Sequence, residues 1–217
     1  MDSEKQPLRL AVLASGRGSN LQAILDSIRD GDLFAKVVVV ISDNPEAYAL
    51  ERARSQGIPA VAALPSAYTS KAEYEQQLLA ASCEAYQAEV VVLAGYMRLL
   101  GSAFLTKYHN RVVNIHPALL PAFPGLHAHR QAIEYGVRFS GCTVHFVDQG
   151  MDTGPIILQA VVSVEPDDTE ETLAERILIE EHRIYPKALE LIARGKVRVE
   201  GRRVQIDSYT VTSIIHE

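Results

Sequence analysis

The stretch LRLAVLASGRGSNLQAILDSI, residues 8–28, combines a strand, a glycine-rich turn and a helix. Leu8 to Ala14 is a short apolar run typical of a buried strand, and the turn SGRGS follows at residues 15–19. Apolar residues then recur at the i, i+3, i+4, i+7 spacing of an amphipathic helix, at Leu21, Ile24, Leu25 and Ile28. Gly31 suits the end of this helix. The stretch therefore predicts the first unit of an α/β fold.

The same alternation continues along the chain. Apolar runs rich in β-branched residues predict buried strands at residues 36–42, 89–94 and 111–115, and a short strand is expected at residues 59–63. Between them, helices are expected at about residues 47–56 and 70–86. Strands that alternate with helices favour a parallel sheet with right-handed crossovers.

The later part of the chain follows another pattern. Residues 142–147 and 156–164 are predicted strands, joined by the turn-rich segment DQGMDTGP with no helix between them, which indicates an antiparallel pair. Asp168 is expected to begin the last long helix, with Glu171 placed for a capping box. Two short strands are expected at 197–199 and 203–206. We predict an open, mostly parallel Rossmann-like sheet with helices on both faces and an antiparallel C-terminal part.

Composition narrows the function classes. The 217 residues carry a net charge of −6, whereas proteins that hold nucleic acid by its phosphates are usually basic. No apolar run reaches the roughly 18 residues of a membrane helix, and the start MDSEKQP shows no signal-peptide pattern. We expect a cytoplasmic protein, a monomer or homodimer, with small-molecule partners and neither nucleic acid nor membrane. Cys83 and Cys142 match no metal spacing and are expected to be buried, reduced thiols.

The glycine-rich turn is a candidate anion site. A strand, a glycine-rich turn and a helix start together present backbone N–H groups and the positive end of the helix dipole to a ligand, here at Gly16, Gly18, Ser19 and Asn20. Ser19 could cap the helix or donate to a phosphate. The turn fits neither GxGxxG nor GxxxxGK[ST], which favours a phosphate monoester over a dinucleotide. The structural alternative is a tight turn with an ordinary serine cap.

Asn114 and His116 stand two residues apart in RVVNIHP, so strand alternation places both side chains on one face. Pro117 ends the strand, and ligands of open parallel sheets gather at that edge. Asn can donate to a developing oxyanion, and His can exchange a proton near neutral pH. The pair suits attack of an external amine on a carbonyl. The alternative is a polar strand end with a solvated His.

Two carboxylates could complete this site. Asp152 lies in the turn MDTGP, where its alternative role is a turn cap. Beside His116 it would orient the imidazole, but no spacing shows that the two meet. Glu181 falls on the apolar stripe of the last helix, so it faces inward and needs a protein or ligand partner. Its alternative is a structural ion pair.

His127 and His129 form an HxH pair in GLHAHR, a spacing found in metal sites. No third ligand with a supporting pattern accompanies them. We therefore predict no metal, and expect His127 to cap or line the site.

Five separated segments carry a family resemblance: LASGRGSNLQAI, VVLAGYMRLL, NIHPALLPAFPGLHAHRQAI, GCTVHFVDQGMDTGPIILQ and EEHRIYPKAL. Their order and spacing across about residues 8–195 resemble the phosphoribosylglycinamide formyltransferase family. The resemblance implies direct transfer of formyl from 10-formyltetrahydrofolate to the amine of glycinamide ribonucleotide. It also implies one domain over residues 1–207, with a nucleotide-binding half at about 8–108, a folate and catalytic half at about 109–207, and a tail at 208–217.

The resemblance further assigns roles. Gly18, Ser19 and Asn20 would hold the substrate phosphate, and Glu181 the ribose. Asn114 and His116 would flank the formyl carbonyl, with Asp152 tuning the His. The folate would be lined by Leu93, Met97, Arg98, Leu99, Leu100, Phe104, Asn114, Val147, Asp148, Gln149, Gly150, Met151 and Asp152. Lys71 stands where the family usually has Arg, so contact with the folate's glutamate tail would lose the bidentate fork.

Three alternatives stay open. Methionyl-tRNA formyltransferase and formyltetrahydrofolate hydrolase resemble the same catalytic half, but each has an additional domain for which this chain has no room. Sugar-nucleotide formyltransferases are a further possibility. A non-catalytic phosphate- or nucleotide-sensing module would use the same glycine-rich turn, but would give Asn114, His116 and Asp152 no purpose.

Overall fold

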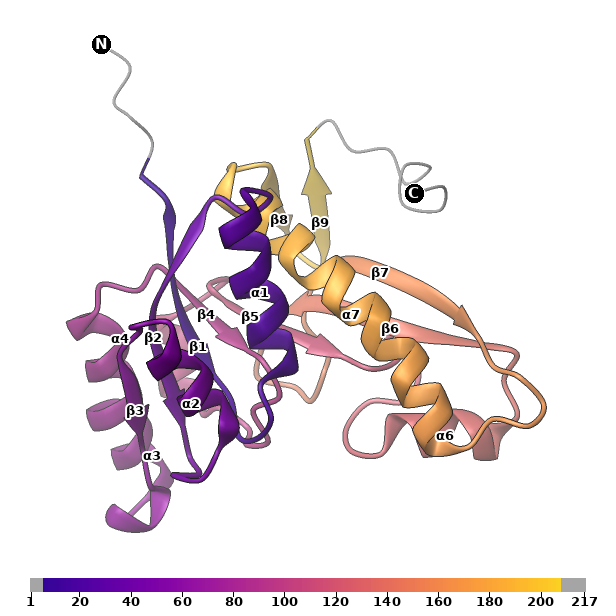
Figure 1. The fold of residues 1–217 in the computed structure, drawn as a ribbon, viewed down its shortest axis with the longest axis horizontal. Coiled ribbons are helices and arrows are strands. Elements are labelled where there is room, and N and C mark those ends of the chain that lie inside the picture. Colours follow the sequence, from indigo (N-terminus) through magenta and orange to yellow (C-terminus); the bar gives the residue numbers. More distant parts are fainter. Residues whose placement is uncertain (1–5, 208–217) are drawn as a thin grey trace. The chain divides into compact units, whose positions relative to one another are not determined.

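The computed structural model describes residues 6–207, and the chain divides into two compact units, the first ending at Val112 and the second starting at Val113. The predicted tail at 208–217 lies outside the described residues. Figure 1 shows the first unit in indigo to magenta and the second in pink to yellow.

The strands of the first unit are β1 (Leu8–Leu13), β2 (Ala35–Ser42), β3 (Ala60–Ala62) and β4 (Val90–Leu93). They pair in the order β3-β2-β1-β4, and every pair is parallel. Their apolar sequences suit strands of a buried parallel sheet. The side chains of Leu10 to Leu13 in β1 and of Val39 to Ile41 in β2 are fully buried. The predicted parallel part of the sheet is confirmed.

The helices of the first unit are α1 (Ser19–Asp30), α2 (Tyr48–Ser55), α3 (Lys71–Glu73), α4 (Ala81–Ala85) and α5 (Ser102–Lys107), with a short 3-10 turn at Pro65–Ala67. Helix α1 ends as predicted at Gly31, whose left-handed conformation lets its N–H bond the carbonyls of Ile28 and Ser27. The structure does not bear out the alternative of a serine cap: the N-cap is Gly18, which makes no side-chain cap bond, and Ser19 is the first helical residue.

The helix expected over residues 70–86 is interrupted. A π-helical segment, η2 (Tyr74–Ala80), separates α3 from α4. The spacing of apolar residues does not reveal such a segment, because it is a short widening of a helix that requires no particular residue types. Helix α5 was not predicted, because its six residues are too few to show a periodic stripe.

The second unit contains β5 (Val112–His116), β6 (Phe139–Phe146) and β7 (Ile156–Ser163). They pair in that order, and both pairs are antiparallel. The predicted antiparallel part is confirmed. Asn114 lies opposite His145, and His116 opposite Thr143.

Two helices and a hairpin complete the second unit: α6 (Ala128–Tyr135), α7 (Glu170–Ala193), β8 (Val197–Glu200) and β9 (Arg203–Ile206). Helix α7 runs across β6 and β7 (Figure 1) and buries Leu173, Ile177 and Ile184 there. Helix α6 was not predicted.

The predicted capping box at the start of α7 is placed one residue too early. The N-cap is Thr169, whose hydroxyl accepts the Thr172 N–H, and Thr172 closes the box in the position expected for Glu171. Asp168 is instead held by Arg176, with two hydrogen bonds of 2.7 and 2.9 Å. The Thr–Thr box satisfies the free backbone N–H groups at the helix start, as the predicted Asp–Glu box would have done. Asp168 is therefore available for the ion pair with Arg176.

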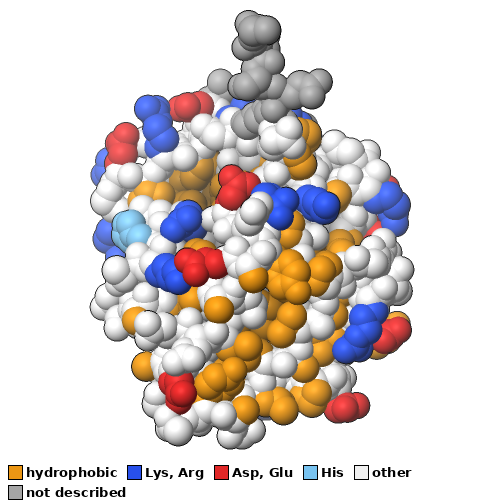
Figure 2. Space-filling model, turned by 90° about the vertical axis from the view of Figure 1, so that its left-hand side faces the viewer, with side chains coloured by type: hydrophobic (Ala, Val, Ile, Leu, Met, Phe, Trp, Pro, Cys, Tyr) orange, Lys and Arg blue, Asp and Glu red, His pale blue; other side chains and the backbone are white. Residues whose placement is uncertain are grey.

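Hydrophobic side chains also reach the surface. Figure 2 looks at the side where Figure 1 shows β3 and α3, and hydrophobic side chains gather there in a band. Large exposed hydrophobic side chains of the first unit include Tyr48, Leu64, Met97 and Leu99. No helix among the described residues is long and apolar enough to cross a membrane.

Candidate active site

Strand β5 presents Asn114 and His116 on one face, as strand alternation predicts, while Val113 and Ile115 are buried on the other. Asn114 is half-buried and His116 is buried, with 5% of its surface exposed. The register with β6 sets Thr143 and His145 beside them. One face of the second unit therefore collects these polar side chains.

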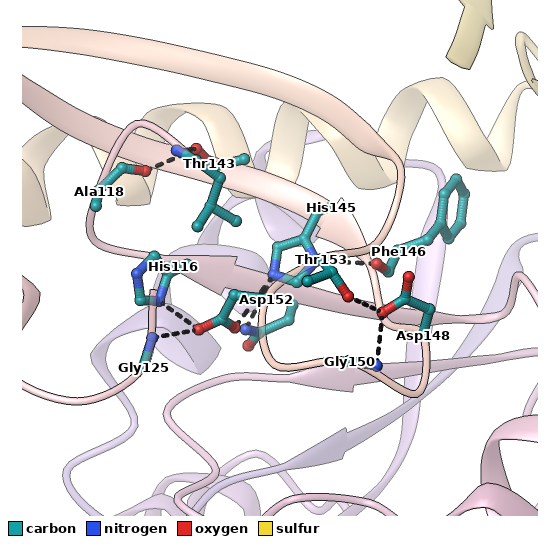
Figure 3. Close-up of polar contacts among 12 residues, drawn as sticks. His116, Ala118, Gly125, Thr143, His145, Phe146, Asp148, Gly150, Asp152 and Thr153 are labelled. Atoms are coloured by element: carbon teal, nitrogen blue, oxygen red, sulfur yellow. Dashed lines mark hydrogen bonds and ion pairs between the residues drawn. The ribbon is translucent and has the colours of Figure 1, made fainter. Parts of the chain in front are cut away.

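Asp152 joins this face from the loop before β7. Its Oδ2 lies 3.4 Å from His116 Nδ1, and the same oxygen accepts the Gly125 N–H at 2.8 Å. The backbone of Asp152 is left-handed, with φ of 54°, a conformation that Asp tolerates better than most residues. Figure 3 shows the carboxylate between His116 and His145. The structure thus contains the contact between Asp152 and His116, which their spacing in the sequence could not establish.

The second nitrogen of His116 is also engaged. Nε2 lies 2.8 Å from the carbonyl oxygen of Phe123. A carbonyl oxygen can only accept, so Nε2 carries the hydrogen and Nδ1 faces the carboxylate. A protonated His116 therefore has an acceptor at each nitrogen, which fixes the plane of the ring.

His145 is the site residue that the sequence interpretation missed. It is buried, with 1% exposed, and its Nε2 lies 3.3 Å from Asn114 Nδ2 and 3.7 Å from Asp152 Oδ1. Its Nδ1 lies 2.9 Å from the carbonyl oxygen of Phe146. Desolvation by burial lowers the pKa of His145, although Asp152 acts in the opposite direction. Alternation along TVHF, which puts Thr143 and His145 on one face, was the available signal.

The loop that delivers Asp152 is organised by Asp148. Its Oδ1 accepts the Gly150 N–H at 3.1 Å and the Thr153 hydroxyl at 2.6 Å (Figure 3). Gly154 is required for packing, because a Cβ there would lie 1.7 Å from the Phe146 carbonyl oxygen. Gln149, Gly150 and Met151 are exposed at the tip of the loop.

In the first unit, the glycine-rich turn is packed against α2. Gly18 has φ of 69°, and a Cβ on it would lie 2.8 Å from Ala49 Cβ. Arg52 of the same helix also holds the turn, with Nε donating to the Arg17 carbonyl at 2.9 Å and Nη1 to Gln22 Oε1 at 2.8 Å. The start of α1 therefore has a defined position, as a phosphate-binding helix start requires.

A second loop of the first unit, residues 95–101, is tied to this turn. The Met97 N–H donates to Ser15 Oγ at 3.0 Å, and the Ser15 N–H to the Gly95 carbonyl at 3.0 Å. Met97 and Leu99 expose 71% and 60% of their surfaces, and Arg98 is exposed as well. At the far end, the Gly101 N–H donates to Oε2 of the buried Glu75 at 2.8 Å. Exposed apolar side chains on an anchored loop suit an apolar ligand.

The remaining predicted residues differ in exposure. Leu93 and Phe104 are core residues, and Phe104 stacks on Tyr108. Val147 and Leu100 are half-buried. Lys71 is exposed, and its Nζ lies 3.7 Å from Glu75 Oε1. Glu181 has 7% of its surface exposed, so its predicted inward orientation is confirmed.

Neither thiol is suited to nucleophilic catalysis. Cys83 and Cys142 are free and buried, as predicted. Burial raises the pKa of Cys83 to about 12 and raises that of Cys142 as well.

One histidine of the HxH pair, His127, lies near a carboxylate. His127 Nδ1 lies 4.0 Å from Glu170 Oε1, and His127 is the N-cap of α6 without a side-chain cap bond. Within residues 6–207, no group of three His, Cys, Asp or Glu side chains is placed to hold a metal ion.

A family model described as formyl transferase matches residues 8–189. The chain belongs to the formyl transferase family. Phosphoribosylglycinamide formyltransferase of Escherichia coli strain K12 is 42% identical over 200 residues, which are 92% of this chain and 94% of that protein. A crystal structure of glycinamide ribonucleotide transformylase 1 from Symbiobacterium toebii has a TM-score of 0.90 and 56% identity, and the match covers 92% of this chain and 94% of that one.

Longer members of the formyl transferase family also match. The trifunctional purine biosynthetic protein adenosine-3 of Drosophila pseudoobscura pseudoobscura is 47% identical over 192 residues, 88% of this chain. This chain spans only 14% of the length of that relative. The mostly parallel α/β fold predicted from the sequence agrees with the structural match.

Proposed function

We propose that this chain transfers the formyl group of 10-formyltetrahydrofolate to the amine of phosphoribosylglycinamide, forming formylglycinamide ribonucleotide and tetrahydrofolate in purine biosynthesis. The observation that carries the proposal is the 42% identity, over nearly the full length of both chains, to a bacterial protein named for this activity. The contact of Asp152 with His116 supports it, because that contact completes a set suited to amine attack on a carbonyl.

In the proposed mechanism the substrate amine attacks the formyl carbon, a C–N bond forms, and the carbonyl electron pair moves onto oxygen. The Asn114 amide and the protonated His116 stabilise this oxyanion. The oxygen pair then re-forms the carbonyl as the bond to the folate nitrogen breaks. The proton lost by the new amide nitrogen is passed, with help from Asp152, to the folate nitrogen that leaves. No enzyme nucleophile is required.

For the phosphorylated substrate we assign Gly18, Ser19 and Asn20 of the first unit to the phosphate. The start of α1 supports this, because the backbone N–H groups of the first helical turn point out of the helix end and the helix dipole attracts an anion. We assign Glu181 of the second unit to the ribose, since it is an inward-facing carboxylate on α7.

For the folate we assign Met97 to Leu100 and Asp148 to Asp152, two exposed or half-exposed loop segments. Leu93, Phe104 and Val147 would form the apolar surroundings of the pterin. Lys71 would meet the glutamate tail as a point charge, in competition with Glu75.

The experiment mixes the purified chain with both substrates and follows tetrahydrofolate formation. Formation that depends on phosphoribosylglycinamide, and not on a sugar-nucleotide amine or methionyl-tRNA, supports the proposal. Asn114→Ala, which removes an oxyanion donor, and His116→Ala, which removes the positive charge beside the oxyanion, should each lower kcat at least about a hundredfold. Binding of both substrates without turnover would instead support the sensing module, and a variant with near-wild-type turnover would remove its residue from the mechanism.

Other sequence-based expectations remain predictions: a single formyltransferase domain over residues 1–207, a monomer or homodimer, and a cytoplasmic location.

A further inference from the structure

The side chain of Asn114 can face the reacting carbonyl in two ways, with its NH2 group or with its oxygen. Only the NH2 group can stabilise an oxyanion, because the amide oxygen would repel it. The strand position of Asn114 does not choose between them, since both orientations occupy the same volume. The orientation must therefore be fixed by a neighbouring group that can only donate, or only accept, a hydrogen bond.

We infer that His145 is a positioning residue that turns the Asn114 amide so that its NH2 group faces the oxyanion. His145 lies directly opposite Asn114 in the β5–β6 register, and its Nε2 is 3.3 Å from Asn114 Nδ2. The inference rests on the proposed function, because it gives His145 its purpose through the role of Asn114.

The tautomer of His145 follows from its other nitrogen. Nδ1 is 2.9 Å from the Phe146 carbonyl oxygen, which can only accept, so Nδ1 carries the hydrogen. In the neutral ring, Nε2 then has a lone pair and can only accept. Asn114 must therefore present its NH2 group to His145, and the second hydrogen of that group remains for the substrate.

A protonated His145 would act in the opposite way. Its Nε2–H would donate to Asp152 Oδ1, now 3.7 Å away, or to the oxygen of a reversed Asn114 amide. The charged neighbours are Asp152, Asp148 and His116, of which the two carboxylates favour protonation and His116 opposes it. Burial outweighs them and lowers the pKa of the ring.

A double-mutant cycle tests the inference. His145→Leu removes the acceptor, whereas His145→Gln can offer its amide oxygen in the same place. We expect His145→Leu to lower kcat about ten- to a hundredfold with less than about threefold change in either KM, and His145→Gln to recover most of the loss. In an Asn114→Ala background, His145→Leu should cost less than about threefold more, because it acts through Asn114.

Cys142→Ala is the matched control, because Cys142 is a buried residue of the same strand on its other face. It should lower thermal stability without changing the cycle. The inference would be overturned if His145→Leu lowered kcat by the same factor in the Asn114→Ala background as in the wild type. Equal losses of kcat for His145→Leu and His145→Gln would also overturn it.

A second measurement does not depend on turnover. Long-range proton–nitrogen NMR of the wild-type chain should show His145 at pH 7 as a neutral ring with hydrogen on Nδ1. An imidazolium or an Nε2–H ring would overturn the inference. Absence of formyl transfer with the expected tautomer present would instead overturn the proposed function alone.

Discussion

Asp152 Oδ2 lies 3.4 Å from His116 Nδ1 while it accepts the Gly125 N–H at 2.8 Å. One oxygen thus ties the loop before β7 to the strand that carries His116 and to the segment that follows it. The Phe123 carbonyl holds the opposite side of the ring at 2.8 Å. The imidazole is oriented by these two acceptors before any substrate binds.

Replacing Asp152 by Asn removes the charge of the side chain but keeps its shape, so it tests what the charge contributes to turnover. Asn tolerates the left-handed backbone at this position and can still accept the Gly125 N–H, so the fold should persist. We expect Asp152→Asn to lower kcat by on the order of 10²–10⁴-fold, because the carboxylate no longer supports the charged ring. Steady-state kinetics with a thermal melt of each protein checks this. Turnover within threefold of wild type would exclude the carboxylate from catalysis.

The glycine-rich turn offers a matched pair of substitutions. Gly18→Ala should lower the free energy of unfolding by about 1–2 kcal/mol for the left-handed backbone alone, and by more for the contact with Ala49. Gly16→Ala should change it little, since nothing lies within 4 Å of its Cβ position. Urea unfolding measures both. Equal losses for the two variants would show that the turn does not need its left-handed glycine.

Glu75 should matter for the folate more than for the phosphorylated substrate. Glu75→Leu leaves the Gly101 N–H without its acceptor, which costs about 1–3 kcal/mol and loosens the 95–101 loop. We expect the KM for the folate donor to rise about tenfold from a loss of that size, with a smaller change for phosphoribosylglycinamide. Glu75→Gln keeps an acceptor and should behave almost as wild type. Equal changes in both KM values would count against a folate role for the loop.

Acid should destabilise the protein through one buried and two half-buried histidines. Burial lowers the pKa of His129, His145 and His182, so the unfolded chain binds protons that the folded chain does not. The free energy of unfolding should therefore fall as pH drops below about 6.5, the ordinary His value, toward the lowered folded-state values. Urea unfolding at pH 7.5 and 5.5 should show a smaller drop for His145→Gln than for wild type. An unchanged drop would mean that His145 titrates normally in the folded state.

The strands of both units could be predicted because their apolar runs are bounded by turn residues. The short helices α5 and α6, the π-helical segment and the N-cap of α7 could not, since few residues and interchangeable caps leave no periodic signal. In the site, Asn114 and His116 follow from strand alternation. Their contacts with Asp152 and His145 depend on loop conformation and on strand register, which tertiary packing sets.

The fate of a carbon-13 label in the formyl group of 10-formyltetrahydrofolate tests the account most directly. With the purified chain and phosphoribosylglycinamide, the label should appear as the formamide of formylglycinamide ribonucleotide, in equal amount to the tetrahydrofolate formed. Asn114→Ala and His116→Ala should slow its appearance by the same factor as tetrahydrofolate formation. Release of the label as free formate, at a rate independent of phosphoribosylglycinamide, would contradict the account and identify a hydrolase.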